Sequence, residues 1–320
     1  MKTMLKELSL GDRITDFFVC SSKNVRVDKN GNKFMQLRLT DASGNIGAIM
    51  WDVSEETANS VDQGQVVKVQ GLVTSDHRSQ PQIKLDQLRS AGAGDEFNLA
   101  ELLPSSARDP EEMEAELAEI RESITNRDLS ALLDEIFDDE IVYRQFCEAP
   151  AAKGVHHNYI HGLLEHSVSV CRVASAIAEQ YPHDVNRDLV VTAALVHDIG
   201  KTSEFNYTVA IDYSDQGRLL GHIIIGEKMV SDAIGRLDSF PEELRLQLLH
   251  LILAHHGEKE YGSPIRPKTL EGFILNHADD VDAKANIFMR LHADTAGTGE
   301  AWSEFHRVLD RFLYLRKAEE

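Results

Sequence analysis

The sequence has little cysteine, no long apolar run and no excess of positive charge. Its three cysteines, Cys20, Cys147 and Cys171, are too few and too scattered for a disulfide framework or a paired-cysteine zinc site. No run approaches the roughly 18–20 apolar residues that cross a bilayer. The opening residues, MKTMLKELSLGD, lack the apolar core of a signal peptide. These absences predict a cytoplasmic protein without a membrane partner.

The net charge of −20 is unevenly distributed along the 320 residues. Residues 1–90 carry 12 Lys and Arg against 11 Asp and Glu, residues 91–150 carry 4 against 17, and residues 151–320 carry 17 against 25. The N-terminal part is therefore nearly neutral, and the overall acidity does not exclude a nucleic-acid-binding surface there. Of the 14 histidines, 13 follow residue 150, which places any imidazole chemistry in the C-terminal part.

The first ninety residues are predicted to form short strands separated by turns. The expected strands are 14–27, 33–41, 45–52, 64–75 and 82–90, with a short helix at 54–61. Five strands with a helix after the third is the order of an OB-fold, a small Greek-key barrel. The stretch GDRITDFFVC…KFMQLRLTDASGNIGAIMWD…GQVVKVQGLV resembles OB domains that bind nucleic acids. Residues 1–90 are therefore predicted to be an OB-fold nucleic-acid-binding domain.

The remainder of the chain is predicted to be helical. Residues 91–150 form an acidic linker with connecting helices, and in DPEEMEAELAEIRESI the residue Asp109 can cap a helix that begins at Pro110. Further helices are expected at 127–147, 161–180, 187–198, 219–237, 241–256, 268–284 and 300–316. Core packing is expected for the last of these, with a subunit contact as the alternative. The predicted fold class is thus multi-domain, a small all-β OB-fold barrel followed by an all-α helical bundle at residues 151–320.

Histidines and aspartates occur on or at the ends of these apolar helical segments. They are, along the chain, His166, the adjacent His197 and Asp198, His222, the adjacent His255 and His256, and Asp279. A single histidine near a core is more often a hydrogen-bonded core residue than a ligand. Seven such residues would each need partners, and helix bundles build metal sites by projecting imidazoles and carboxylates inward. This donor set predicts a site for divalent Mn, Fe, Co, Ni, Zn or Mg.

The order His166 … His197-Asp198 … Asp279 resembles the signature of the HD-domain metal-dependent phosphohydrolases. The resemblance implies that these four residues ligate a metal and that Asp198 is the bridge if a second ion is present; whether one or two ions bind stays open. The additional histidines His222, His255 and His256 match HD proteins that hold two or more ions; which of the last two ligates stays open. Asp279 is chosen over Asp280 because HADDVDAK aligns with the AD-x-L-D run of the family, and Asp280 is expected on the helix surface or behind the ligands.

Longer strings extend the resemblance over most of the chain. PAAKGVHHNYIHGLLEHSVSV, AALVHDIGKTSEF, GRLLGHIIIG and HHGEKEYGSPIRPKTLEG are similar to the YhaM-type 3′→5′ exoribonuclease family, which joins an OB domain to an HD domain. The resemblance implies metal-dependent release of nucleoside 5′-monophosphates from the 3′ end of single-stranded RNA. One departure is His161, which stands where a glycine is expected.

The resemblance also suggests roles for individual residues. Lys201, in HDIGK, matches a lysine associated with the phosphate, so Lys201 and Asp198 are the catalytic candidates; a solvated lysine at a helix end is the alternative. On the OB domain, two rings could stack on bases while nearby cations contact the backbone. These nucleic-acid-binding candidates are Phe34 and Trp51 together with Arg26, Lys29, Lys33 and Arg38. Barrel core is the alternative for the two rings, and a solvated face is the alternative for the cations.

Two other functions are consistent with the sequence. The first is an HD phosphodiesterase or nucleotidase that acts on small or cyclic nucleotides, for which HHGEKEYGSP gives distant support. The second is a non-catalytic single-strand-binding protein, which the intact set of candidate ligands disfavours. The predicted partner is single-stranded RNA, with single-stranded DNA as the alternative, and a homo-oligomer is left open.

Overall fold

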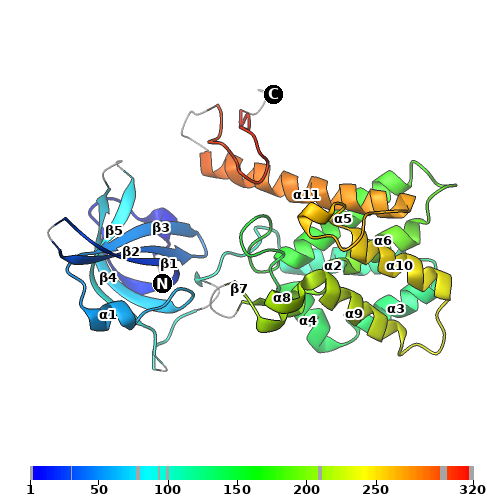
Figure 1. Cartoon of the computed structure of the whole chain (residues 1–320), viewed down its shortest axis with the longest axis horizontal. Coiled ribbons are helices and arrows are strands. Elements are labelled where there is room, and N and C mark those ends of the chain that lie inside the picture. The colour runs from blue at the N-terminus through cyan, green and yellow to red at the C-terminus, as the bar shows by residue number, and fades with distance from the viewer. Residues whose placement is uncertain are drawn as a thin grey trace. The chain divides into compact units, whose positions relative to one another are not determined.

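The computed structural model describes residues 3–29, 31–76, 80–92, 94–98, 101–207, 211–295 and 301–316. It divides into two compact units, one formed by Met1–Ser105 with Asn206–Asp212 and the other by Ser106–Phe205 with Tyr213–Glu320 (Figure 1). Among the described residues, no helix combines the length and the apolar character that a membrane crossing needs.

The first unit is a closed barrel. Its strands are β1 (Arg13–Val27), β2 (Lys33–Asp41), β3 (Gly44–Met50), β4 (Val66–Ser75) and β5 (Pro81–Ser90). They follow the spatial order β1-β2-β3-β5-β4, and β3 pairs with β5 in parallel while the other pairs are antiparallel. A 3₁₀ helix, η1 (Leu5–Glu7), precedes β1, and α1 (Glu55–Asn59) separates β3 from β4. The predicted strand order and helix position of an OB barrel are confirmed.

Strand β2 shows which residues the barrel encloses. Met35, Leu37 and Leu39 point inward and are buried in the barrel core. Because successive side chains of a strand point to opposite faces, Phe34 and Arg38 lie on the outer face. The alternation in sequence allowed either face for Phe34, and the burial of Met35, Leu37 and Leu39 places it on the outside.

The predicted linker is partly packed against the barrel. The ring of Phe97 lies 5.2 Å from that of Phe17, centroid to centroid, and Leu102 is buried. The backbone N–H of Ala42 donates to the carbonyl of Glu101. Residues 93, 99 and 100 of this segment lie outside the described residues.

The second unit is a bundle of helices. They are α2 (Pro110–Glu122), α3 (Arg127–Phe137), α4 (Glu140–Glu148), α5 (Gly162–Ala178), α6 (Arg187–Val196), α7 (Lys201–Glu204), α8 (Asp215–Leu220), α9 (His222–Ile234), α10 (Glu242–Ala254) and α11 (Leu270–Thr295). A 3₁₀ helix, η3 (Lys259–Tyr261), follows α10. Short strands β6 (Phe205–Asn206) and β7 (Asp212–Tyr213) pair with each other at the points where the chain leaves and re-enters this unit. The predicted all-α bundle is confirmed, apart from this small two-stranded sheet.

Helix α6 lies at the centre of the bundle. Every residue from Leu189 to Val196 is buried, and α6 packs against α5, α10, α11 and α3. A helix that is apolar on all sides has to be surrounded by other elements. The polar residues that follow α6 therefore emerge inside the bundle rather than at its surface.

The prediction of a helix at 300–316 is wrong. Residue 300 lies outside the described residues, and residues 301–316 form an irregular ribbon with β-bridges between Trp302 and Tyr314 and between His306 and Arg311. Asp310 takes a positive φ of 51°, which a continuous helix cannot include. The ribbon buries Leu309, Leu313 and Leu315 against Ile287 of α11, so these leucines do pack in a core, although as part of a ribbon.

Helix boundaries also differ from those predicted. The segment 127–147 contains two helices, because the side chain of Asp139 accepts hydrogen bonds from Ile141 and Val142 and begins α4. The helix predicted at 268–284 continues to Thr295 as α11.

Candidate functional site

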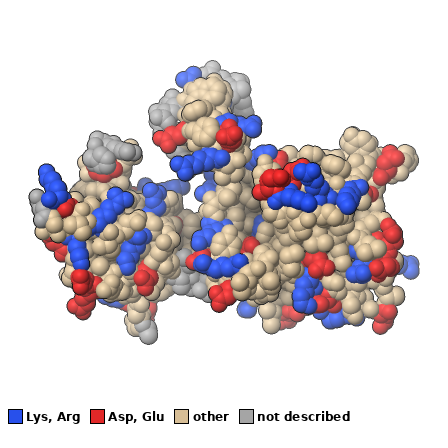
Figure 2. Space-filling model, in the orientation of Figure 1, with Lys and Arg blue, Asp and Glu red and all other residues tan. Residues whose placement is uncertain are grey.

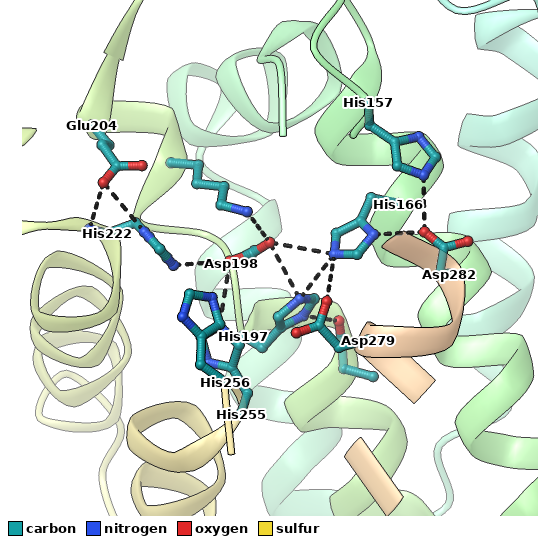
Figure 3. Close-up of polar contacts among 12 residues, drawn as sticks. His157, His166, His197, Asp198, Glu204, His222, His255, His256, Asp279 and Asp282 are labelled. Atoms are coloured by element: carbon teal, nitrogen blue, oxygen red, sulfur yellow. Dashed lines mark hydrogen bonds and ion pairs between the residues drawn. The ribbon is translucent and has the colours of Figure 1, made fainter. Parts of the chain in front are cut away.

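Asp198 occupies the centre of the bundle. It follows His197, the C-cap of α6, and both side chains are buried. Figure 3 shows the Asp198 carboxylate between His166 on one side and His222 on the other. An isolated carboxylate in such a position is costly unless positive charge or hydrogen bonds compensate it.

The two oxygens of Asp198 face different imidazoles. Oδ2 lies 3.4 Å from Nε2 of His166 and 3.3 Å from Nε2 of His197. Oδ1 lies 3.4 Å from Nε2 of His222 and 3.6 Å from Nε2 of His255. His256 belongs to the same group of potential ligand atoms as His222 and His255. One carboxylate is thus shared by two clusters.

Backbone carbonyls fix the tautomers of three of these histidines. Nδ1 of His197 lies 2.8 Å from the carbonyl oxygen of Ala194, and Nδ1 of His255 lies 2.7 Å from that of Ile252. Nδ1 of His256 lies 2.9 Å from the carbonyl oxygen of Tyr261. A carbonyl can only accept, so Nδ1 carries the proton in each ring and Nε2 presents a lone pair.

The first two of these contacts use the ends of helices. The last carbonyls of α6 and α10 have no helical N–H to accept from. A histidine placed directly after each helix donates to the carbonyl three residues earlier. The same hydrogen bond satisfies the helix end and turns Nε2 toward Asp198.

Carboxylates orient the other two histidines. Nδ1 of His166 lies 2.7 Å from Oδ2 of Asp282, and Nδ1 of His222 lies 3.2 Å from Oε1 of Glu204. Carboxylates behind an imidazole ligand are a common feature of metal sites, where they fix the ring and raise its basicity.

The resulting arrangement fits a divalent cation. Oδ1 of Asp198, Nε2 of His222 and Nε2 of His255 are buried without a hydrogen-bond partner. The lone pairs of the two nitrogens and of the carboxylate oxygen face each other with no hydrogen atom between them. Each buried polar group without a partner lowers the stability of the folded state by about 1–3 kcal/mol. A cation between the imidazoles and the carboxylate would satisfy all three atoms. Imidazole and carboxylate without thiolate suit the divalent ions predicted from the sequence.

Asp279 joins the cluster around Oδ2, while its neighbour Asp280 does not. Oδ1 of Asp279 lies 3.2 Å from Nε2 of His166. Asp280 is paired with Lys284 on the exposed side of α11, with 2.6 Å between Oδ2 and Nζ. The structure therefore brings together all seven metal-ligand candidates of the sequence, His166, His197, Asp198, His222, His255, His256 and Asp279.

Burial and charge set the protonation of the imidazoles. Burial lowers the pKa of His222 and of His255, and it lowers the pKa of His256 to about 4. These rings are neutral near pH 7, as metal ligands must be. Burial acts in the same direction on His166, but Asp198, Asp279 and Asp282 outweigh it and raise the pKa of His166 well above its usual range. Three carboxylates at one imidazole favour a positive charge there, whether from a proton or from a metal ion.

Lys201 lies beside Asp198 rather than in solvent. Its Nζ donates to Oδ2 of Asp198 at 2.5 Å, and the side chain is buried. Burial opposes ionisation of Asp198, yet the positive charge of Lys201 holds the pKa of Asp198 well below its usual range. The carboxylate is therefore ionised.

The glycine between Asp198 and Lys201 allows two helices of the site to approach each other closely. A Cβ on Gly200 would lie 2.0 Å from the carbonyl oxygen of His222. Only a residue without a side chain allows the end of α6 to approach the first residue of α9 this closely.

His161 is tolerated at a position that suits glycine. It is the N-cap of α5 and has a positive φ of 66°, a region that residues with a side chain rarely adopt. Its Nδ1 lies 2.8 Å from the carbonyl oxygen of Cys147, so the ring is held by a hydrogen bond.

Sequence reasoning missed the residues behind the ligands. Asp282 contacts Nδ1 of His166 and also lies 2.9 Å from Nε2 of His157. His156 lies nearby, with its ring 5.1 Å from that of His166 and its Nδ1 buried without a partner. The spacing of Asp279 and Asp282 on one helix was a usable signal, since residues three apart lie on the same face. No local pattern marks Glu204 as a partner of His222.

The barrel residues that were predicted to bind nucleic acid do not form a single cluster. The rings of Phe34 and Trp51 lie 5.0 Å apart at 30°, and Trp51 is exposed. Arg26 lies opposite Phe34 in the β1–β2 register, and Trp51 directly follows β3, so Arg26, Phe34 and Trp51 form a row. Figure 2 shows several Lys and Arg side chains on the visible face of the barrel.

The other three cations lie apart from this row. Lys33 is paired with Glu55, with 2.5 Å between Nζ and Oε1. Arg38 donates to Oδ1 of Asn45 at 2.6 Å, and Lys29 is exposed beside the β1–β2 turn.

Comparison with known proteins adds independent information on both units. A family model described as the HD domain matches residues 163–284, and one described as an OB-fold nucleic acid binding domain matches residues 20–91. The chain is 34% identical to the "3′-5′ exoribonuclease YhaM" of Listeria monocytogenes, covering 91% of each chain. It is 34% identical to the protein of that name from Bacillus velezensis, covering 97% of this chain and 96% of the relative. The Geobacillus protein of that name is 32% identical, with 95% and 92% covered.

Substitution of three aspartates on α11 tests the geometry of the cluster. Asp279→Ala is expected to lower the amount of bound metal, because it removes a carboxylate that faces His166. Asp282→Asn is expected to weaken metal affinity by about 10–100-fold, as is usual for residues behind a ligand. Asp280→Ala is the matched control, and elemental analysis with metal titration is the measurement. A loss of metal in Asp280→Ala as large as that in Asp279→Ala would show that the helix register is wrong.

Metal binding is also expected to depend on pH through His166. Below the pKa of His166 in the metal-free protein, an incoming cation displaces its proton, so metal affinity rises with pH by up to about tenfold per unit. Calorimetric titration in two buffers of different ionisation enthalpy counts the protons released. Asp282→Asn should reduce the release near pH 7, since Asp282 helps to raise this pKa. Affinity that stays constant from pH 6 to pH 8 would contradict the assignment.

Proposed function

The chain belongs to the family of the 3′-5′ exoribonuclease YhaM, and from that membership we propose that it is a metal-dependent exoribonuclease acting on single-stranded RNA from the 3′ end. Nucleoside 5′-monophosphates are the proposed products, and single-stranded DNA is the alternative substrate. The observation that supports hydrolytic chemistry most strongly is the convergence of four imidazole Nε2 atoms on the two oxygens of Asp198.

Two ions are proposed, one on each side of Asp198. The first would be held by His166, His197, Asp198 and Asp279, and the second by Asp198, His222, His255 and His256. The division follows the two oxygens of Asp198, each of which faces its own set of rings. Bound divalent ions neutralise phosphoryl oxygens and lower the pKa of water, which is the chemistry that phosphodiester hydrolysis requires.

Three residues beside the proposed ligands orient the ligand side chains and set the local charge. Asp282 and Glu204 hold the rings of His166 and His222 through Nδ1. Lys201 holds Oδ2 of Asp198 and adds a positive charge close to where an anionic phosphate would lie. We assign Lys201 as a residue that positions Asp198 and attracts the phosphate.

The barrel is proposed to bind the RNA strand. OB-folds bind single strands by stacking bases on aromatic rings and contacting the backbone with cations, largely without sequence readout. The row of Arg26, Phe34 and Trp51 offers both kinds of contact on the outside of the barrel. Lys29, Lys33 and Arg38 are proposed to contact phosphates more weakly, and two of them already have polar partners.

The direction of degradation can be tested with a tailed hairpin. A 5′-labelled RNA with a single-stranded 3′ tail is expected to give a ladder of shortening products that stops near the duplex, because stacking surfaces on the barrel use unpaired bases. Blocking the 3′ end should abolish the ladder. Internal cleavage products, or unchanged rates with a blocked end, would exclude a 3′-5′ exonuclease.

The barrel rings can be tested separately from hydrolysis. Phe34→Ala/Trp51→Ala is expected to raise the Kd for single-stranded RNA at least about tenfold, since stacking on one ring contributes about 1–3 kcal/mol. Leu10→Ala removes another exposed apolar side chain from the same unit and is the control. Hydrolysis of bis(p-nitrophenyl) phosphate reports on the metal centre of each variant. An RNA affinity equal to that of the control would remove these rings from binding.

A further inference from the structure

The ribbon of residues 301–316 has two faces of opposite character. Backbone hydrogen bonds join its two strands, from the N–H of Ser303 to the carbonyl of Leu313 and from the N–H of Leu315 to that of Ala301, each at 2.9 Å. Because side chains alternate along a strand, residues 313 and 315 point to one face and residues 312, 314 and 316 to the other. Figure 1 shows this segment, in red, beside the end of α11.

The inner face anchors the ribbon. Leu309, Leu313 and Leu315 are buried in a small cluster with Ile287, and Phe288 and Leu291 of α11 pack against it. This apolar contact fixes the position of the ribbon on its own domain. The outer face is therefore held in place by contacts on the opposite side of the ribbon.

The outer face exposes four aromatic rings. Trp302, Phe305, Phe312 and Tyr314 are between 48% and 60% exposed. They form two edge-to-face pairs, with ring centroids 5.1 Å apart for Trp302 and Tyr314 and 5.4 Å apart for Phe305 and Phe312. Single exposed apolar residues are common on protein surfaces, but an ordered group of large rings indicates an interaction site.

Arginines accompany these rings. Arg316 follows Phe312 and Tyr314 on the outer face, and Arg307 and Arg311 are also exposed. Residues 301–316 contain these three arginines and two acids, whereas residues 151–320 as a whole carry 17 Lys and Arg against 25 Asp and Glu. The ribbon thus carries a net charge of +1, whereas residues 151–320 as a whole are acidic.

We propose that the outer face of this ribbon binds single-stranded RNA, as a second contact outside the metal centre and the barrel. The inference rests on the proposed function, because it concerns the same substrate. Rings on a strand surface that stack on bases, together with guanidinium groups that contact phosphates, are the features by which single strands are bound. The arginines favour an anionic strand over a second copy of the chain, because an isologous contact would place the same arginines against one another.

The first experiment removes two rings of the outer face. Phe312→Ala/Tyr314→Ala leaves the buried leucines in place and is expected to raise the Kd for a single-stranded RNA at least tenfold. The control, Tyr181→Ala/Leu246→Ala, removes two apolar side chains of similar exposure elsewhere on the same domain and should bind RNA like the unchanged protein. Degradation of RNA and hydrolysis of bis(p-nitrophenyl) phosphate are measured for each protein. In the ring variant, the loss on RNA should exceed the loss on the small diester at least tenfold.

The second experiment uses Trp302 as a reporter. The chain has two tryptophans, so the fluorescence of Trp51→Phe comes from Trp302 alone. Oligoadenylate added in the presence of EDTA, which prevents hydrolysis, is expected to quench this fluorescence, and a matched fully paired RNA duplex is expected to quench it far less.

Three results would overturn the inference. The first is an equal loss of activity on RNA and on the small diester in the ring variant. The second is no quenching of Trp302 fluorescence by oligoadenylate. The third is a lower molecular mass for the ring variant in light scattering, which would identify the face as a subunit contact. Failure of the proposed function is distinguishable, because the unchanged protein would then not degrade RNA at all.

Discussion

A buried carboxylate whose two oxygens face different imidazoles is the constraint on which the second unit depends. Asp198 lies at the end of an apolar helix, where water cannot solvate its charge. Lys201 compensates one oxygen, while the other has no hydrogen-bond partner. The ends of α6 and α10, the start of α9 and the middles of α5 and α11 all bring polar groups to this one residue. Gly200 is required there because α9 approaches too closely for any side chain.

Specific hydrogen bonds orient the histidines that are the candidate metal ligands. At the ends of α6 and α10, a histidine donates to the carbonyl three residues earlier, which fixes its tautomer through a bond that the helix end needs anyway. Asp282 and Glu204 do the same for His166 and His222 through carboxylates. A metal would therefore meet rings that are already oriented, and little conformational entropy would be lost on binding.

The sequence was sufficient to predict those parts of the fold and of the site that depend on local patterns of residues. Alternation and turn residues predicted the five strands. Residue types on apolar helices, together with the family resemblance, predicted which side chains meet at Asp198. It failed where local patterns have two solutions: the leucines at 309, 313 and 315 fit both a helix and a ribbon, and Phe34 fitted either face of its strand. Glu204 was missed because 18 residues separate it from its partner, His222, and only the folded chain brings the two together.

We propose that two divalent ions share the carboxylate of Asp198. A crystal structure of the protein grown with Mn²⁺, with anomalous scattering recorded at the manganese edge, tests it most directly. Two anomalous peaks are expected, one beside Oδ2 near His166 and His197 and one beside Oδ1 near His222 and His255. A single peak, or a pair of peaks that do not share Asp198, would contradict it.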